Sequence, residues 1–249
     1  MDSGYGQLER LIGESGRIVF FGGAGVSTES GIPDFRSTGG LYHQEWAYSP
    51  ETILSHTFFM AQTAEFYRFY RAKMIVDGAK PNAAHIALTR LEKRGKISAV
   101  VTQNIDGLHQ MAGSKKVFEL HGSIRRNYCM KCGEFYPLSV IAESGSVPDG
   151  IPRCAKPGCG GIIKPDVVLY EEGLDSGVMD GAIAAIAGAD MLIIGGTSLT
   201  VYPAAGLVNY FHGPALVVIN RDVVDGGRNA AVVIQDSIGK VFAALELDK

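Results

Sequence analysis

Four cysteines gather in two short pairs near the middle of the chain. Cys129 and Cys132 form a Cys-x2-Cys pair, and after a 21-residue gap Cys154 and Cys159 form a Cys-x4-Cys pair. Each short loop can present two thiolates to one ion, and four thiolates suit tetrahedral zinc at Zn–S distances of about 2.3 Å. Disulfides are the alternative, although a reducing compartment disfavours them. The spacing predicts one structural zinc ion with no open position for a substrate.

A glycine turn after an apolar run offers backbone amides to a phosphate. Gly23-Ala24-Gly25-Val26-Ser27 follows residues 17–21, which read as a buried strand, and we expect a helix to begin at the turn. The third glycine of the dinucleotide fingerprint is replaced by Thr28, so a plain tight turn explains the motif as well. A second turn, Gly196-Thr197-Ser198, ends another apolar run. Two such turns at the ends of parallel strands would form a nucleotide crevice.

Three further polar side chains are candidates for chemistry. Asn104 and Asp106 follow the apolar run Ile97–Thr102, at the strand edge where α/β proteins bind ligands. His121 follows Val117 and Phe118, and histidine is the natural general base near neutral pH. Taken alone, a turn that ends a strand and a core histidine explain the same residues.

The elements that must position these residues alternate between strand and helix. Residues 97–102, 190–195 and 215–220 are short apolar runs bounded by Gly, Asn or Asp, typical of strands buried on both faces of a parallel sheet. Helical patterns cover residues 83–93 and 178–187. The alternation predicts an α/β fold with a doubly wound, Rossmann-like parallel sheet.

Two stretches interrupt this alternation. Residues 38–80 are aromatic and helical, and residues 124–164 are rich in Gly and Pro and contain all four cysteines. We expect these insertions to form a smaller zinc-binding and helical part. The large Rossmann-like part would then comprise residues 1–37, 81–123 and 165–249 of a single catalytic domain.

Composition excludes several classes of protein. The chain has 249 residues, 46% hydrophobic and 20% charged, with a formal net charge of −3, which excludes disorder of the whole chain. It has no Lys/Arg block, so we expect no nucleic-acid partner. Gly and Pro break the charge-free stretch 191–220, so we expect no membrane segment. The first ten residues contain no signal-like apolar run, and we expect a cytoplasmic protein.

Six blocks of the chain resemble the sirtuins, the NAD-dependent protein lysine deacylases, and in particular bacterial-type deacetylases. They run in the family's order: Gly23-Ala-Gly-Val-Ser-Thr-Glu-Ser-Gly-Ile-Pro-Asp-Phe-Arg36, Thr102-Gln-Asn-Ile-Asp-Gly-Leu-His109, Leu120-His-Gly122, the two cysteine pairs, Gly196-Thr-Ser198 and Ile219-Asn-Arg221. The resemblance implies that NAD is consumed as a co-substrate and that one zinc ion is structural. It also implies a product set of nicotinamide, O-acetyl-ADP-ribose and free lysine.

The resemblance assigns roles to individual residues. It implies that His121 is the catalytic base, that Asn104 orients the ribose and the attacking oxygen, and that Asp106 with Ile105 holds the nicotinamide. Phe35 would cover the reacting carbon. The full set expected to bind NAD is Gly23, Ala24, Gly25, Ser27, Thr28, Asp34, Phe35, Arg36, Gln103, Asn104, Ile105, Asp106, His121, Gly196, Thr197, Ser198, Asn220, Arg221 and Ile238.

The same resemblance describes the substrate. An acetyl-lysine protein or peptide should lie as an extended strand between residues 168–174 and 199–202, adding main-chain hydrogen bonds. Such binding reads little side-chain sequence, so several protein substrates are expected. The substrate-binding residues expected are Val168, Leu169, Tyr170, Tyr67 and Val201.

One aromatic helix indicates which acyl group on the substrate lysine the resemblance implies. Members that prefer succinyl or malonyl lysine carry Tyr-x-x-Arg there, whereas this chain has Tyr67 and, three residues later, Tyr70. Arg71 is one position further, about 100° around the helix. The chain therefore lacks the arginine that would pair with the carboxylate of a succinyl or malonyl group. We expect a neutral acetyl group instead, because an unpaired buried carboxylate is costly. An aromatic core stripe is the alternative explanation for these tyrosines.

Three other functions compete with deacetylation. Mono-ADP-ribosyl transfer uses the same chemistry and would add mass to a target protein. A non-catalytic NAD sensor or zinc scaffold would not need His121, Asn104 and Asp106 together. A hydride-transferring dehydrogenase would need an acidic residue about 20 positions beyond the glycine turn, at the end of a second strand, and the chain lacks one there.

Overall fold

The computed structural model describes residues 4–34, 46–223 and 230–246, and its largest feature is a six-stranded sheet. Every neighbouring pair of strands runs parallel. The order is β3-β2-β1-β7-β8-β9, so the chain reverses its direction of progress between β1 and β7. This confirms the predicted doubly wound, Rossmann-like sheet. Its strands are β1 (Ile18–Gly22), β2 (Ile97–Thr102), β3 (Val117–Glu119), β7 (Met191–Gly195), β8 (Ala215–Ile219) and β9 (Val232–Ile234).

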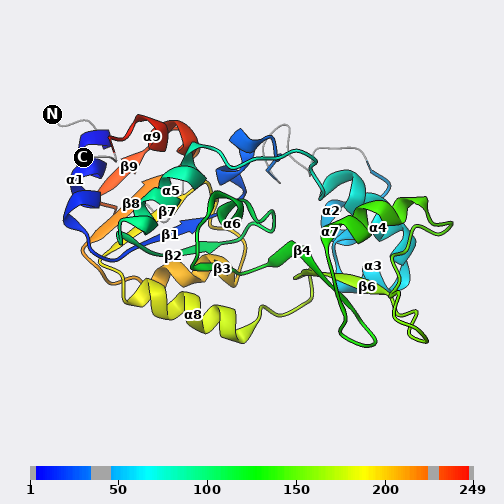
Figure 1. Cartoon of the computed structure of the whole chain (residues 1–249). Helices are drawn as coiled ribbons and strands as arrows, with labels where there is room; N and C mark the ends of the chain where they lie inside the picture. The colour runs from blue at the N-terminus through cyan, green and yellow to red at the C-terminus, as the bar shows by residue number, and fades with distance from the viewer. Residues whose placement is uncertain (1–3, 35–45, 224–229, 247–249) are drawn as a thin grey trace.

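Helices cover both faces of this sheet (Figure 1). On one face pack α1 (Gly4–Glu14), α5 (Ala83–Lys93) and α9 (Ile238–Ala244), whereas α8 (Ser176–Ala187) packs on the other. Strand β1 shows why both faces need helices. Its Ile18 and Phe20 pack on the face covered by α1, α5 and α9, and its Val19 and Phe21 pack on the face covered by α8. Alternate side chains of a strand point to opposite faces, so an all-apolar strand belongs between two helical layers.

Several boundaries follow the predictions closely. The bounds of α5 and β2 are those predicted, and β1, β7 and β8 differ by one residue at one or both ends. Helix α8 starts at Ser176 rather than 178, because the Asp175 carboxylate caps it by accepting a hydrogen bond from the Val178 amide at 2.8 Å.

The prediction of a regular helix after the first glycine turn is wrong. Two short 3₁₀ turns, Ala24–Val26 and Thr28–Ser30, follow β1 instead. The Gly25 amide donates to the Gly196 carbonyl at 2.8 Å rather than into a helix, and Gly31, with φ of 83°, ends the second turn. Within the two turns the amides bond three residues back, for example Ser27 to Ala24 and Gly31 to Thr28, so neither turn extends into an α-helix.

The insertions form a smaller second packing unit. A three-stranded antiparallel sheet, ordered β5-β4-β6, consists of β5 (Phe135–Tyr136), β4 (Gly122–Cys129) and β6 (Ile163–Val167). Helices α2 (Pro50–Ile53), α3 (His56–Ala61), α4 (Thr63–Lys73) and α7 (Leu138–Glu143) surround it. Their shared core contains the fully buried aromatic stripe Phe59, Phe66, Tyr67, Phe69 and Tyr70.

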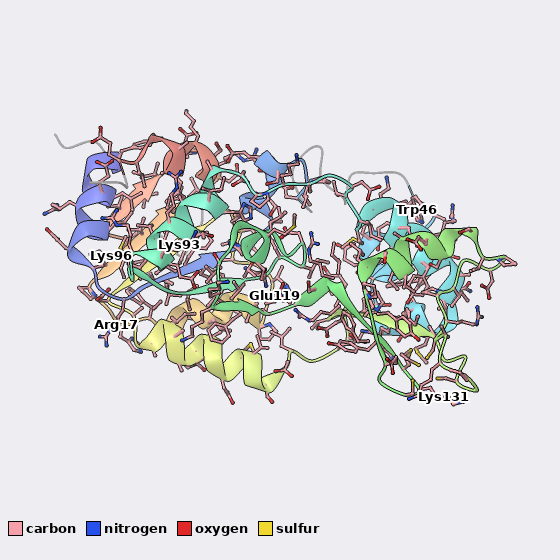
Figure 2. The ribbon with its side chains drawn as sticks, viewed as in Figure 1. Arg17, Trp46, Lys93, Lys96, Glu119 and Lys131 are labelled. Atoms are coloured by element: carbon pink, nitrogen blue, oxygen red, sulfur yellow. The ribbon has the colours of Figure 1, made fainter. Side chains whose placement is uncertain are left out.

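An ion-pair cluster lies where the two units join. Arg126 of β4 donates to Glu119, at the end of β3, at 2.6 Å and to Asp166 of β6 at 2.7 Å. Figure 2 shows Glu119 at this junction. Because Glu119 belongs to the six-stranded sheet, the cluster ties the small unit to the large one. Within the described part of the chain, no helix combines the length and apolar character needed to cross a membrane.

Candidate active site

A cavity of about 840 Å³ opens at the carboxyl ends of the parallel strands, between the two units. Gly23, Gln103, Gly196 and Asn220 each line it, and each directly follows one of β1, β2, β7 and β8. This is the switch-point location at which doubly wound folds bind ligands. On the opposite side the small unit contributes charged residues, among them Lys73 and Arg125, and a group of apolar side chains: Leu54, Met74, Ile75, Val76, Ile124 and Leu138.

The two glycine turns are in backbone contact on the cavity wall. A Cβ atom on Gly25 would lie 2.8 Å from the Gly196 Cα and 2.9 Å from its carbonyl oxygen. Gly196 itself has a left-handed φ of 57°, which glycine adopts without strain. Glycine at both positions therefore lets the turns join into one backbone surface that a pyrophosphate can approach.

A buried polar network connects the first loop to the loop after β2. Ser27 donates its hydroxyl hydrogen to Asp106 Oδ2 at 2.7 Å and accepts from Asn104 Nδ2 at 3.0 Å. The other Asp106 oxygen accepts from the Leu108 amide at 2.8 Å, at the first residue of α6 (Leu108–Ala112). Both Asp106 oxygens are thus occupied, and Asp106 is only 9% exposed. The network fixes Asn104 and Asp106 in one arrangement.

His121 lies on the cavity wall in a fixed tautomer. Its Nδ1 lies 2.9 Å from the Gln103 carbonyl oxygen. A carbonyl can only accept, so Nδ1 carries the proton and Nε2 remains the acceptor. Burial lowers the pKa of His121 below its usual value, although the bond to Gln103 acts in the opposite direction. Gln103 is in turn held by Thr197, whose hydroxyl oxygen accepts from its Nε2 at 3.1 Å.

The expected peptide-binding segment lies beside this histidine. Val168 donates its amide hydrogen to the His121 carbonyl at 3.0 Å. The first residue of the segment after β6 is therefore in hydrogen-bond contact with the candidate base. Tyr170 then pairs with the small unit through the Leu54 carbonyl at 2.9 Å and the His56 amide at 3.0 Å. Val168, Leu169, Tyr170 and Val201 all line the cavity.

Two of the predicted contact residues do not reach the cavity. Tyr67 is fully buried in the core of the small unit, and its hydroxyl donates to the Ile163 carbonyl. Thr28 bonds through its hydroxyl to the Gly25 carbonyl at 3.1 Å and is absent from the cavity wall. The hydroxyl of each side chain is held by a backbone carbonyl, and the contacts of Tyr67 with the substrate and of Thr28 with NAD stay predictions.

The arginine beside the aromatic stripe is fully engaged elsewhere. Arg71 Nη1 donates to Ser144 Oγ and to the Gly150 carbonyl, both at 2.8 Å. Tyr70, where an arginine would stand in succinyl-preferring relatives, is fully buried. Neither residue lines the cavity, so neither offers a positive charge to an acyl carboxylate.

Most of the remaining predicted NAD-binding residues also line the cavity, on loops that follow five different strands. They are Asp34, Ser198, Asn220, Arg221 and Ile238, together with Ala24, Ile105 and Thr197. Asp34 and Arg221 form an ion pair at 3.4 Å that joins the first loop to the loop after β8. Phe35 and Arg36 lie outside the described residues.

Arg125 is a charged cavity residue that the sequence analysis did not identify. Arg125 of β4 lines the cavity and donates through Nε to the Asp106 carbonyl at 3.1 Å. No motif marks it, because its position depends on the small unit folding back over the sheet.

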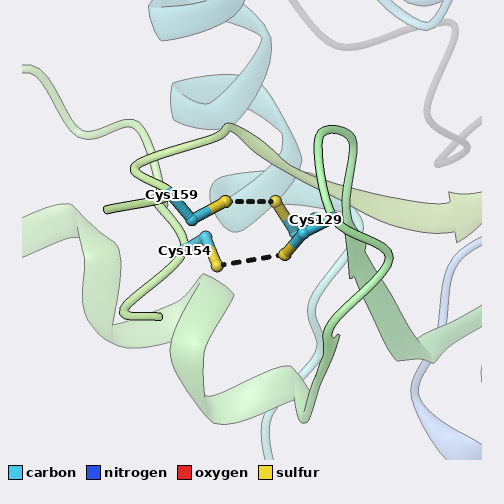
Figure 3. Close-up of side chains that lie close together, drawn as sticks. Cys129, Cys154 and Cys159 are labelled. Carbon is cyan, nitrogen blue, oxygen red and sulfur yellow. Dashed lines mark hydrogen bonds between the residues drawn. The ribbon is translucent and has the colours of Figure 1, made fainter. Parts of the chain in front are cut away.

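The four cysteines form a separate cluster at the end of the small unit. Their sulfur atoms all lie within 4.8 Å of one another, with Cys129 and Cys159 3.5 Å apart and Cys132 and Cys154 3.6 Å apart. These separations exceed a disulfide bond of about 2.05 Å but fit the edges of a zinc–thiolate tetrahedron. Figure 3 shows the thiols of Cys129, Cys154 and Cys159 turned towards one another. None of the four lines the cavity, so the cluster fits one structural zinc ion.

Comparison with known proteins gives a consistent result. The profile of the Sir2 family matches residues 23–203. An NAD-dependent protein deacetylase from Clostridium acetobutylicum is 58% identical over 238 residues, 95% of each chain. One from Clostridium perfringens is 59% identical over 245 residues, covering 97% of this chain and 98% of its own.

Solved structures agree with these relatives. A Sir2 structure with a deacetylated p53 peptide and 3'-O-acetyl ADP-ribose has a TM-score of 0.86 and 37% identity, covering 95% of each chain. A Sir2 complex with a p53 peptide and NAD+ has a TM-score of 0.83 and 37% identity, again over 95% of each chain.

Proposed function

Because this chain belongs to the Sir2 family, we propose that it removes acetyl groups from protein lysine side chains in an NAD-dependent reaction. The products are nicotinamide, O-acetyl-ADP-ribose and the free lysine. The observation that carries the proposal is the Nδ1-protonated His121, which presents Nε2 as a base on the wall of a cavity at the sheet's switch point. A protein that only bound NAD would need the crevice but not the base.

The residues of the cavity divide the work between binding and proton transfer. NAD, when bound, supplies the ribose carbon that accepts the acyl oxygen and the nicotinamide that leaves. The joined glycine turns and the hydroxyls of Thr197 and Ser198 bind the phosphates and the adenosine ribose. Asn104 and Asp106, fixed by Ser27, hold the nicotinamide ribose and the nicotinamide amide.

His121 then acts as the general base. Its Nε2 removes a proton from a ribose hydroxyl, and the Gln103 carbonyl stabilises the ring as it becomes charged. The apolar wall of the small unit excludes water, which strengthens the electrostatic interactions at the reacting carbon.

The acetyl-lysine protein lies as an extended strand along Val168, Leu169 and Tyr170 on one side and Val201 on the other. All four line the cavity, and Val168 is bonded to the backbone of His121, which brings the peptide to the base. The two packing units work as one catalytic domain, since the cavity needs side chains from both. We place the enzyme in the cytoplasm, where its unpaired thiols remain reduced.

The test follows both products of one reaction. The protein is incubated with an acetyl-lysine peptide, with and without NAD, and nicotinamide and peptide mass are measured. We expect one nicotinamide per free lysine, and a loss of at least about 100-fold in rate for His121→Ala with NAD binding retained. A mass increase on the protein substrate would instead indicate ADP-ribosyl transfer. Release of no nicotinamide with any acyl peptide would favour ADP-ribosyl transfer or NAD sensing over deacetylation.

A further inference from the structure

We propose that Glu29 is a positioning residue for NAD: it ties the first glycine loop to α9 and thereby sets the adenosine side of the cavity. This inference rests on the proposed function, because it concerns the same NAD site. Glu29 does not itself line the cavity, so it acts through the backbone on either side of it.

The Glu29 carboxylate makes two long-range contacts. Oε2 accepts from the Gly239 amide at 2.7 Å, and Oε1 accepts from the Ser237 hydroxyl at 3.3 Å. Ser237 is the residue before α9, yet its side chain makes no capping hydrogen bond to the helix. A carboxylate from the other end of the sequence therefore satisfies a backbone amide that a local cap would normally satisfy.

The backbone of α9 is shaped to receive this carboxylate. A Cβ atom on Gly239 would lie 2.5 Å from Glu29 Oε2 and 2.7 Å from its Cδ. The carboxylate thus occupies the space that any larger residue at 239 would need. The contact depends on two residues that are far apart in sequence, and each can be changed separately.

Both ends of this contact adjoin the cavity. Ser27, two residues before Glu29, lines it and is bonded to Asp106, while Ser237 and Ile238, just before Gly239, line its adenosine side. The first loop therefore has one tether towards the nicotinamide side and another towards the adenosine side. Ile238 itself is held in the core beside Gly195. Without Glu29 the second tether is lost, and the Ser237 hydroxyl and the Gly239 amide are no longer bonded to the first loop.

Affinity measurements test this without relying on turnover. Binding of NAD, ADP-ribose and nicotinamide is measured by calorimetry for the natural protein, Glu29→Ala and Glu29→Gln. We expect Glu29→Ala to weaken NAD and ADP-ribose on the order of threefold to tenfold and to leave nicotinamide unchanged. Glu29→Gln keeps one acceptor oxygen and should recover part of the loss. In steady-state assays the KM for NAD should rise while kcat stays near the natural value.

A second variant and a matched control exclude a general loss of stability. Gly239→Ala should weaken ADP-ribose binding in the natural background, yet cost nothing further in Glu29→Ala, where the space is vacant. Glu9→Gln is the control, because Glu9 also accepts from a backbone amide beyond α9, that of Glu246 at 2.7 Å, but lies away from the cavity. It should leave affinity unchanged.

The outcomes separate the two proposals. If the natural protein binds neither NAD nor ADP-ribose, the proposed function fails. If it binds both but Glu29→Ala matches its affinities, the role of Glu29 is refuted. Additive effects of Glu29→Ala and Gly239→Ala, or an equal loss in Glu9→Gln, would also overturn it.

Discussion

At the scale of single residues, the environment of His121 determines which ring nitrogen can serve as the proposed base and over which pH range it is neutral. The Gln103 carbonyl fixes the proton on Nδ1, so Nε2 is free to accept one. Burial lowers the pKa of the ring, which keeps it neutral at pH values where an exposed histidine is partly charged. The sequence could predict this base from its motif but not the carbonyl that orients it, because Gln103 is separated from His121 by a strand.

The pH dependence of the reaction follows from this pKa. Only the neutral ring can act as a base, so kcat/KM for the acetyl peptide should rise with pH through the pKa of the free enzyme and then level off. Because that pKa is lowered, the rise should be centred below about 6.5, the usual value for histidine. Measuring kcat/KM from pH 5 to 8 locates the midpoint of this rise. A midpoint above 6.5 would mean that a charged group, not burial, dominates at His121.

At the scale of elements, two buried histidines join α5 and α6 behind the Asp106 loop. The rings of His85 and His109 lie 4.7 Å apart, and neither nitrogen of His109 has a hydrogen-bond partner among the described residues. Burial lowers the pKa of His85 to about 4, although Asp106 acts in the opposite direction. Burial and the neighbouring His85 lower that of His109 to about 3.

These values predict a loss of stability in acid. Below about pH 6.5 the unfolded chain binds a proton at His109 and the folded chain does not. The free energy of unfolding therefore decreases as the pH is lowered, until the pH reaches the pKa of His109 in the folded protein. Each such histidine lowers the free energy of unfolding by up to about 1.4 kcal/mol for every unit by which the pH is lowered. His109→Leu should therefore reduce the stability lost between pH 7.5 and 5.5 by about 1 kcal/mol in urea unfolding. An unchanged loss would show that His109 is charged in the folded protein; the exposed His212→Gln is the control.

The elements also show how far the sequence could predict the structure. Strand β2 and helix α5 could be predicted to the residue, because a buried parallel strand and a capped amphipathic helix have strong local patterns. The turn after β1 could not, since the Gly25 amide bonds to Gly196, a residue of a distant strand. Tyr67 shows the same limit: a buried stripe and a ligand pocket are equally aromatic, and only the fold places this side chain behind the cavity wall.

At the scale of the whole molecule, the cavity exists only because two units with different chemistry face each other. The six-stranded sheet supplies the glycine turns, Asn104, Asp106 and His121, and the small unit supplies an apolar wall. The arginine cluster of Glu119, Arg126 and Asp166 ties the units together next to His121. In the proposed reaction we expect the acyl-lysine to lie between the two units, with its acyl group towards the apolar side chains of the small unit.

This arrangement predicts a strong preference for neutral acyl groups. The small unit presents the apolar Met74, Ile75 and Leu138 to the cavity, whereas Arg71 does not line it and bonds through Nη1 to Ser144 and Gly150. We therefore expect Arg71 not to pair with a succinyl carboxylate. Leaving such a charge unpaired costs several kcal/mol, so kcat/KM should fall by at least about 100-fold from acetyl to succinyl peptides.

The measurement compares acetyl, butyryl and succinyl forms of one peptide. Butyryl is the control for size, because it has the chain length of succinyl without the charge. If butyryl is used well and succinyl is not, charge is the cause. Equal use of acetyl and succinyl would instead mean that a cation of the cavity wall, such as Arg125, pairs with the carboxylate, and would contradict this prediction.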